Sequence, residues 1–165
     1  MKILVLSDSH AGLSFMKACI RAVKPNAVVH LGDYFDDGKA MAEENPHILF
    51  HQVPGNCDHY RCPPWQQSIL IHMVCGVRLY MTHGHIHRVK SGIGALLKDA
   101  RAADVQAVLY GHTHEADCHQ EADGLWVLNP GACGSWGGSA GVIEVEDKRI
   151  VDCRIIRHED LEEIV

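Results

Sequence analysis

Residues 1–10 read MKILVLSDSH, an apolar run that is followed at once by a polar turn. Ile3 to Leu6 contain no polar residue, as expected for a strand that is buried on both faces of a parallel sheet. Ser7 to Gly12 are turn-like, and the apolar residues of Leu13 to Val23 recur with the spacing of one helix face. This order of strand, turn and helix predicts an α/β fold.

The same pattern continues through the first half of the chain. Lys24-Pro25-Asn26 ends the first helix, and Ala27 to Leu31 predict a second buried strand. A short helix is expected around Lys39 to Glu44, and a third strand from Ile48 to Val53. Alternation of strands with helices predicts a parallel sheet with right-handed crossovers.

After Pro63-Pro64 the pattern changes to successive strands. Ser68 to Val74 and Val77 to Thr82 predict a hairpin, and Gly94 to Ala103 predict a helix. The further strand candidates are Val105–Tyr110, Glu115–Glu121, Leu125–Leu128, Ala140–Val145 and Arg149–Arg157. Because no internal repeat or linker interrupts the chain, we expect a single α/β domain over residues 1–165, with two packed sheets.

Composition restricts the partners and the compartment. The 165 residues are 47% hydrophobic and 22% charged, with a formal net charge of −6, so we expect no duplex nucleic-acid partner. No apolar stretch reaches the roughly 20 residues of a membrane span, and residues 1–10 lack the features of a signal peptide. Seven cysteines without a C-x-x-C pair predict reduced thiols. We therefore expect a cytoplasmic protein without membrane association.

Polar clusters follow five of the predicted strands. They are Asp8-Ser9-His10, Gly32-Asp33, Gly55-Asn56-Cys57-Asp58, Thr82-His83-Gly84-His85 and Gly111-His112-Thr113-His114. In open α/β sheets ligands bind outside the carboxyl ends of the strands. The five loops should therefore converge on one crevice and bring Asp, His and Asn side chains together.

These residue types suit divalent transition metals. Imidazole and carboxylate together fit Zn, Fe, Ni, Co or Mn, whereas carboxylates alone would indicate Mg or Ca. Asp8 and His10 can bind one ion from a single turn, and Asp33 can bridge two ions with its two oxygens. His112 and His114 can share one ion or divide between two.

The ordered set D-x-H, G-D-x-x-D, G-N-x-D, T-H-G-H and G-H-T-H resembles the calcineurin-like metallophosphoesterases. The G-N-C-D box and the later N-P-G segment resemble their small bacterial and archaeal phosphodiesterase branch, over residues 3 to about 145. The resemblance implies two mixed β-sheets packed as a sandwich and flanked by α-helices. It also implies one metal held by Asp8, His10, Asp33 and His114, and a second held by Asp33, Asn56, His83 and His112.

The implied function is that of a binuclear-metal-dependent phosphoesterase, and a phosphodiesterase rather than a phosphomonoesterase. Two divalent ions, Mn²⁺ first among Mn²⁺, Ni²⁺, Co²⁺, Fe²⁺ and Zn²⁺, would generate a bridging hydroxide that attacks phosphorus in line with the leaving oxygen. The substrate would be a small or nucleotide-like phosphodiester. Asp33 and Asn56 would belong both to the metal site and to the catalytic residues.

Cys57 departs from the family pattern, because many members have at this position a His that assists the leaving group. A neutral thiol replaces imidazolium poorly, so we expect His85 or His59 to take this part, with diesters favoured over alkyl monoesters. Asp58 is expected to hold a metal ligand or a neighbouring His in its tautomer. His30 is expected to be packed behind the site.

Other features leave alternatives open. The glycine-rich segment around Trp136 is either a lid over the site or a plain surface loop. Trp65 next to Pro63-Pro64 could form a contact surface on a loop, so a homo-oligomer is one alternative. The same fold also serves as a catalytically silent, protein-binding subunit of a membrane-trafficking coat, so a non-catalytic metal-binding scaffold is the competing hypothesis. All seven ligand positions are filled here, which favours the enzyme.

Overall fold

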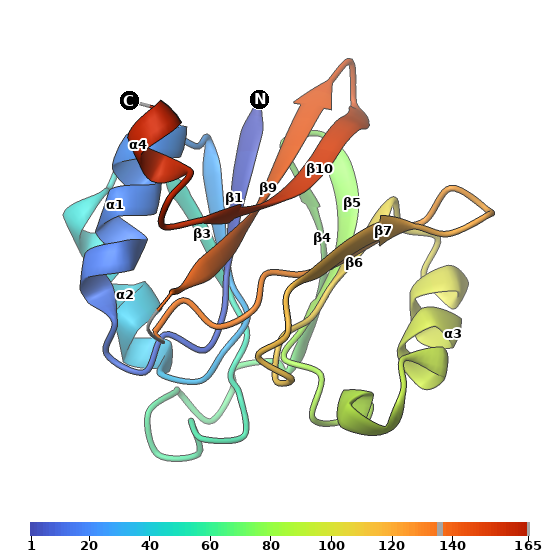
Figure 1. The fold of residues 1–165 in the computed structure, drawn as a ribbon. Helices are drawn as coiled ribbons and strands as arrows, with labels where there is room; N and C mark the ends of the chain where they lie inside the picture. Colours follow the sequence, from blue (N-terminus) through green and yellow to red (C-terminus); the bar gives the residue numbers. More distant parts are fainter. Residues whose placement is uncertain (135–136, 165) are drawn as a thin grey trace.

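The computed structural model describes residues 1–134 and 137–164, and it arranges them as two β-sheets packed face to face (Figure 1). The first sheet has the strand order β10-β9-β1-β2-β3. In chain order its strands are β1 (Lys2–Leu6), β2 (Ala27–His30), β3 (Leu49–Gln52), β9 (Ser139–Glu146) and β10 (Arg149–Arg157). β1, β2 and β3 are parallel, as predicted, whereas β9 is antiparallel to β1 and to β10.

The second sheet has the order β4-β5-β6-β8-β7. Its strands are β4 (Ile69–Val74), β5 (Val77–Thr82), β6 (Ala107–Leu109), β7 (Asp117–Gln120) and β8 (Trp126–Asn129). β4 and β5 form the predicted hairpin, β5, β6 and β8 are parallel, and β7 is antiparallel to β8. Both sheets are thus mixed, which confirms the expected fold class.

Helices cover the outer face of each sheet. On the first sheet these are α1 (Leu13–Val23), α2 (Phe35–Glu44) and the short α4 (Leu161–Ile164), and on the second sheet α3 (Gly94–Ala102) follows a 3₁₀ turn, η1 (Val89–Ser91). α2 begins four residues before the expected Lys39. The carboxylate of Asp58 accepts the amide hydrogens of Tyr34 and Phe35, so a contact from a distant loop starts this helix.

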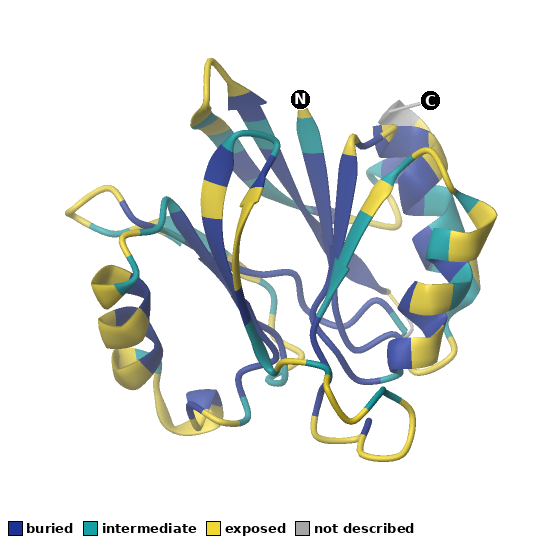
Figure 2. Ribbon diagram, turned by 180° about the vertical axis from the view of Figure 1, so that it is seen from behind, coloured by how far each residue is buried: buried dark blue, intermediate teal, exposed yellow. Residues whose placement is uncertain are grey.

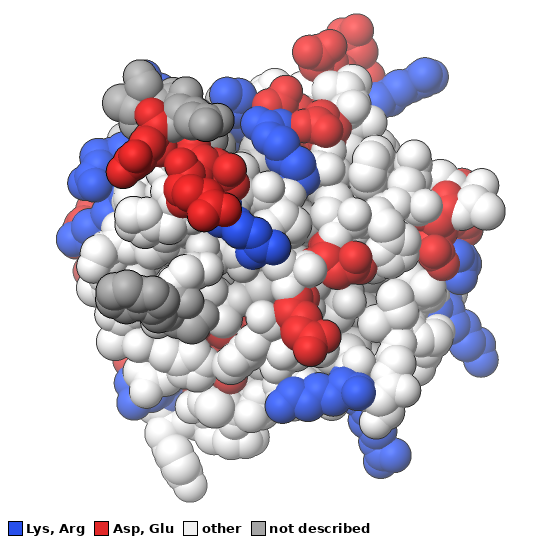
Figure 3. Space-filling view, viewed as in Figure 1, with Lys and Arg blue, Asp and Glu red and all other residues white. Residues whose placement is uncertain are grey.

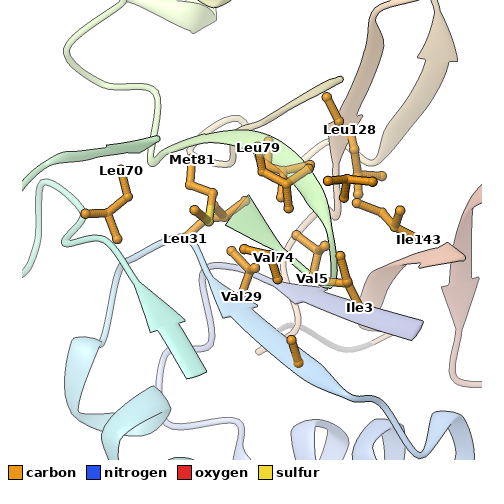
Figure 4. Close-up of a cluster of buried hydrophobic side chains, with 14 of the residues drawn as sticks. Ile3, Val5, Val29, Leu31, Leu70, Val74, Leu79, Met81, Leu128 and Ile143 are labelled. Carbon is orange, nitrogen blue, oxygen red and sulfur yellow. The ribbon is translucent and has the colours of Figure 1, made fainter. Parts of the chain in front are cut away.

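The uninterrupted apolar run of β1 serves two separate cores. Ile3 and Val5 lie between the sheets, in one buried cluster with second-sheet residues such as Leu79 (Figure 4). Leu4 and Leu6 point to the other face and pack among the buried residues of α1. All four β1 side chains are fully buried, and each contributes about 1.5–3 kcal/mol of transfer free energy.

The carboxyl ends of β1, β2, β3, β5 and β6 meet at one end of the molecule, which is the lower end in Figure 1. Figure 2 shows the long connection between β3 and β4 as a largely exposed loop at this end. On the face shown in Figure 3, Lys and Arg are interspersed with Asp and Glu. Within the described residues, no helix has the length and apolar character needed to cross a membrane.

Candidate metal centre

Asp8 lies at the centre of the converging loops and is fully buried. Its Oδ2 accepts hydrogen bonds from Ser7 Oγ at 2.6 Å and from the His112 amide at 3.2 Å. Its Oδ1 lies 3.0 Å from His114 Nε2 and 4.0 Å from His10 Nε2. One oxygen is therefore held by the protein, while the other faces imidazole nitrogens.

Asp33, in the loop three residues after β2, has the same division between its two oxygens. Oδ1 accepts the Cys57 amide hydrogen at 3.0 Å, and Oδ2 lies 3.6 Å from His83 Nε2. Burial alone would raise the pKa of Asp33, but the hydrogen bond from the Cys57 amide opposes this, and the pKa of Asp33 lies below its ordinary value. Asp33 is thus held as a carboxylate.

The carbonyl of Leu31 fixes the tautomer of His83. His83 Nδ1 lies 2.7 Å from this oxygen, and because a carbonyl can only accept, Nδ1 carries the proton. Nε2 of the neutral ring is then an acceptor, and it faces Asn56 Oδ1 at 3.1 Å, Asp33 Oδ2 at 3.6 Å and Asp8 Oδ1 at 4.0 Å. Acceptors that face one another at such short distances repel, and a cation among them removes the repulsion. The donor set therefore fits a divalent metal ion.

Two groups of side chains offer donor atoms that all lie within 4.8 Å of one another. The first is Asp8, His10 and His114, of which the two His are exposed, and the second is the fully buried set Asp8, Asp33 and His83. The groups share Asp8. The structure thus brings five of the seven expected ligands into these two groups, and Asn56 contacts the second through His83.

His112 and His85 complete the same cluster. The His112 ring centroid lies 5.0 Å from that of His83, and the His85 centroid lies 5.4 Å from His83 and 6.2 Å from His112. Burial lowers the pKa of both His112 and His85. Both rings are therefore favoured in the neutral form, in which imidazole binds metals.

The backbone of the site is strained. Five of the seven expected ligands have a positive φ, namely Asp8 (53°), His10 (44°), Asp33 (55°), His112 (71°) and His114 (63°). Such conformations in non-glycine residues typically cost about 1–3 kcal/mol each, and they cluster at functional sites. This clustering is independent structural support for a functional site at the strand ends.

Two glycines next to the ligands are needed for close approach. A Cβ on Gly55 would lie 2.1 Å from Asp33 Oδ1, and a Cβ on Gly111 would lie 2.1 Å from Ser7 Oγ. Neither glycine has a positive φ. A side chain at Gly55 would displace the carboxylate of Asp33, and a side chain at Gly111 would displace Ser7, which holds the carboxylate of Asp8.

Asp58 and His30 lie behind the ligands. Asp58 is fully buried, and its carboxylate accepts three backbone amide hydrogens, from Tyr34, Phe35 and Gly55. His30 is also fully buried, 3.0 Å from a serine hydroxyl, and burial lowers its pKa to about 4. Asp58 thus joins the loop after β3 to the start of α2, and His30 is a neutral packed side chain.

Some positioning groups carried no signal in the sequence. The Ser7 hydroxyl and the Leu31 carbonyl act through a neighbour or through the backbone, which no residue pattern reveals. Asn129 Nδ2 donates to Gly111 O at 3.3 Å and to Thr113 Oγ1 at 2.9 Å, and thus supports the loop that carries the last two His. The position of Asn129 directly after a strand, in the N-P-G segment, could have indicated it. Trp136 lies outside the described residues.

Comparison with known proteins identifies the family. Residues 1–148 match the calcineurin-like phosphoesterase superfamily domain, and the chain belongs to this superfamily. It is 28% identical to a phosphodiesterase of Methanocaldococcus jannaschii over an alignment of 170 positions, which covers 90% of this chain and 95% of the relative. It is also 28% identical to a probable metallophosphoesterase of Mycoplasma pneumoniae over 134 residues, or 79% of this chain and 78% of that one.

Solved structures share the fold. An uncharacterised Streptococcus pneumoniae protein, a predicted phosphoesterase, superimposes with a TM-score of 0.72 at 21% identity, covering 95% of this chain and 97% of its own. Wild-type Vps29 of Entamoeba histolytica, solved with Zn²⁺, has a TM-score of 0.73 at 19% identity, covering 95% and 99%. These likenesses concern the fold alone.

Proposed function

We propose that this protein is a binuclear-metal-dependent phosphodiesterase that hydrolyses a small or nucleotide-like phosphodiester. The observation that carries the proposal is the set of acceptor atoms that face one another at His83 Nε2, from Asn56, Asp33 and Asp8. The similarity to a phosphodiesterase of Methanocaldococcus jannaschii supports the diester as substrate class.

Two divalent cations, with Mn²⁺ as the first candidate, are assigned to seven residues. Asp8, His10, Asp33 and His114 would hold one cation, and Asp33, Asn56, His83 and His112 would hold the other. When bound, such cations act as Lewis acids and make water nucleophilic near neutral pH.

The chain itself orients the groups that face these ions. Ser7 and the His112 amide hold one oxygen of Asp8, so its other oxygen is directed at the donors. The Leu31 carbonyl directs the lone pair of His83 into the site, and the Cys57 amide does the same for Asp33. Catalysis of this kind depends on such prior orientation.

Cys57 is a poor proton donor to a leaving group. Burial, followed by the negative charge of Asp33, raises the pKa of its thiol, so the thiol holds its proton. We assign leaving-group protonation to His85 or His59 and expect a preference for esters with acidic leaving groups. A Cys57→His variant should hydrolyse esters of poorer leaving groups relatively faster, and an unchanged dependence of rate on leaving-group acidity would refute this role.

A metal-binding scaffold is the second candidate. Vps29 proteins of Cryptosporidium parvum and Entamoeba histolytica share the fold, with TM-scores of 0.71 and 0.73. Tyr60 and Trp65, both exposed on the loop beside the site, offer a contact surface for a protein.

The two candidates are separated by assaying metal-stripped protein against bis(4-nitrophenyl) phosphate and 4-nitrophenyl phosphate, with Mn²⁺, Ni²⁺, Co²⁺, Zn²⁺ or Mg²⁺ added singly. We expect metal-restored hydrolysis of the diester that Asp33→Asn and His112→Ala abolish. His72→Ala, on the exposed side of β4, is the matched control and should retain activity. Two bound ions per chain without turnover would favour the scaffold.

A further inference from the structure

A cavity of about 200 Å³ lies beside the metal centre, between the loop that follows β3 and the loop that follows β5. Its walls include Pro54, Pro63 and Pro64 from the first loop and His85 from the second. Metal coordination as assigned above uses none of these four residues.

The cavity begins where the metal centre ends. Gly55 lines it, and the backbone of Gly55 packs so closely on Asp33 that a Cβ there would lie 2.1 Å from Oδ1. On the opposite side the His85 ring also lines it, with its centroid 5.4 Å from that of His83. A group attached to a phosphate at the metal centre could therefore extend into this space.

The walls offer a carboxylate but no strongly basic side chain. Among the described residues that line the cavity none is Lys or Arg, and the carboxylate is that of Asp58, which accepts three backbone amide hydrogens. Proline rings supply apolar surface, and His59, Gln66 and Ser68 supply polar groups. An anionic group placed here would lose its water without gaining a cation, whereas a flat uncharged ring would keep polar partners for its edge.

We propose that this cavity binds the leaving group of the diester and selects an uncharged aromatic or heterocyclic ring over a group that carries further negative charge. The inference rests on the proposed phosphodiesterase function and narrows it to a substrate class. An aryl or nucleoside ester meets this requirement, and an ester whose leaving group is itself a phosphate does not.

The test uses two methyl aryl phosphates whose 4-nitrophenyl leaving group carries either hydrogen or a 3-carboxylate. The quantity compared is a ratio of kcat/KM values: that of the ester with the uncharged leaving group divided by that of the ester with the carboxylated leaving group. It is measured in wild-type protein and in variants. Because the two esters are the same throughout, their intrinsic reactivities cancel when the ratio is compared between proteins.

Ser68 is half-buried at the cavity edge, in the bend directly before β4, so single substitutions there should still allow the chain to fold. Ser68→Lys places a cation on the wall and should lower the ratio at least fivefold. Ser68→Phe fills the space and should raise KM for the ester with the uncharged leaving group about tenfold. This corresponds to roughly 1.4 kcal/mol of lost binding free energy. Gln120→Lys adds the same charge on β7, away from the cavity, and should leave the ratio unchanged.

The possible failures are distinct. If wild-type protein hydrolyses the esters with added metal, but the ratio in Ser68→Lys and the KM in Ser68→Phe match the wild type, the cavity does not hold the leaving group. If neither ester is turned over with any metal, the phosphodiesterase function fails, and this inference fails with it.

Discussion

Substitution of Asp58 tests whether this residue organises the site or takes part in the chemistry. Its fully buried carboxylate accepts amide hydrogens from Tyr34 at 2.8 Å, Phe35 at 2.9 Å and Gly55 at 2.7 Å. These bonds join the start of α2 to the loop after β3, and Asp33 lies between the two segments. Asp58→Ala should therefore loosen both segments at once.

The magnitude follows from the number and type of these bonds. Each hydrogen bond to a charged group contributes about 1.5–3 kcal/mol, and three such bonds set an upper limit that entering water would reduce. We expect Asp58→Ala to lower the free energy of unfolding by about 3–5 kcal/mol, as when one partner of a buried charged pair is removed. For a chain of this size, that corresponds to a fall in Tm of roughly 10 °C. Asp58→Asn keeps one acceptor but turns an amide NH₂ toward Gly55, and should cost about 1–3 kcal/mol.

Urea unfolding of the metal-free variants measures this directly, since no metal then adds to the stability. Asp36→Ala is the matched control, because Asp36 is half-exposed and its ion pair with Arg61 is long, at 3.9 Å. It should change stability by less than about 1 kcal/mol. An Asp58→Ala protein within about 0.5 kcal/mol of the wild type would refute the reasoning. If that protein were also inactive, Asp58 would have a direct role in catalysis.

Three further outcomes are expected. Gly111→Ala should displace Ser7 from Asp8, because the new Cβ would lie 2.1 Å from Ser7 Oγ. The variant should be less stable by about 1–3 kcal/mol, and calorimetry should find a lower affinity for Mn²⁺. His30 has a folded pKa of about 4, below the ordinary 6.5, so the unfolded chain takes up its proton first and stability is lost as pH falls from about 6.5 toward 4. This loss amounts to about 3 kcal/mol, and urea unfolding at several pH values should find it smaller in His30→Asn. Mn²⁺ at a hundred times its Kd should stabilise wild-type protein by about 2.7 kcal/mol, and should stabilise Asp33→Asn less, in thermal melts.

Much of the fold was predictable because local patterns and packing agree. The unbroken apolar run of β1 predicted burial on both faces, and Ile3 and Leu4 do pack into different cores. The start of α2 was placed late, because the acceptor that begins this helix is Asp58, more than twenty residues away. A contact of that kind depends on the tertiary fold and leaves no trace in helix propensity.

The site was predictable in residue type but not in backbone conformation. Polar residues after each strand identified the five loops, since parallel strand ends meet at one edge. The glycines of these loops differ in conformation, since Gly32 and Gly84 have a positive φ whereas Gly55 and Gly111 do not. Five of the seven expected ligands themselves have a positive φ, and Gly55 and Gly111 leave room for the carboxylates of Asp33 and Asp8.

The exposure of the two donor groups bears on the choice between enzyme and scaffold. Asp8, Asp33 and His83 are buried, which would suffice for an ion that only stabilises the loops. In the other group, the side chain of His10 is 36% exposed and that of His114 is 50% exposed, although both share Asp8 with the buried group. Structural metal sites are closed, whereas catalytic sites keep an open position for water or substrate. One buried and one exposed donor group suit a centre that holds one ion firmly while presenting a second ion to a phosphate, and this asymmetry favours the phosphodiesterase over the scaffold.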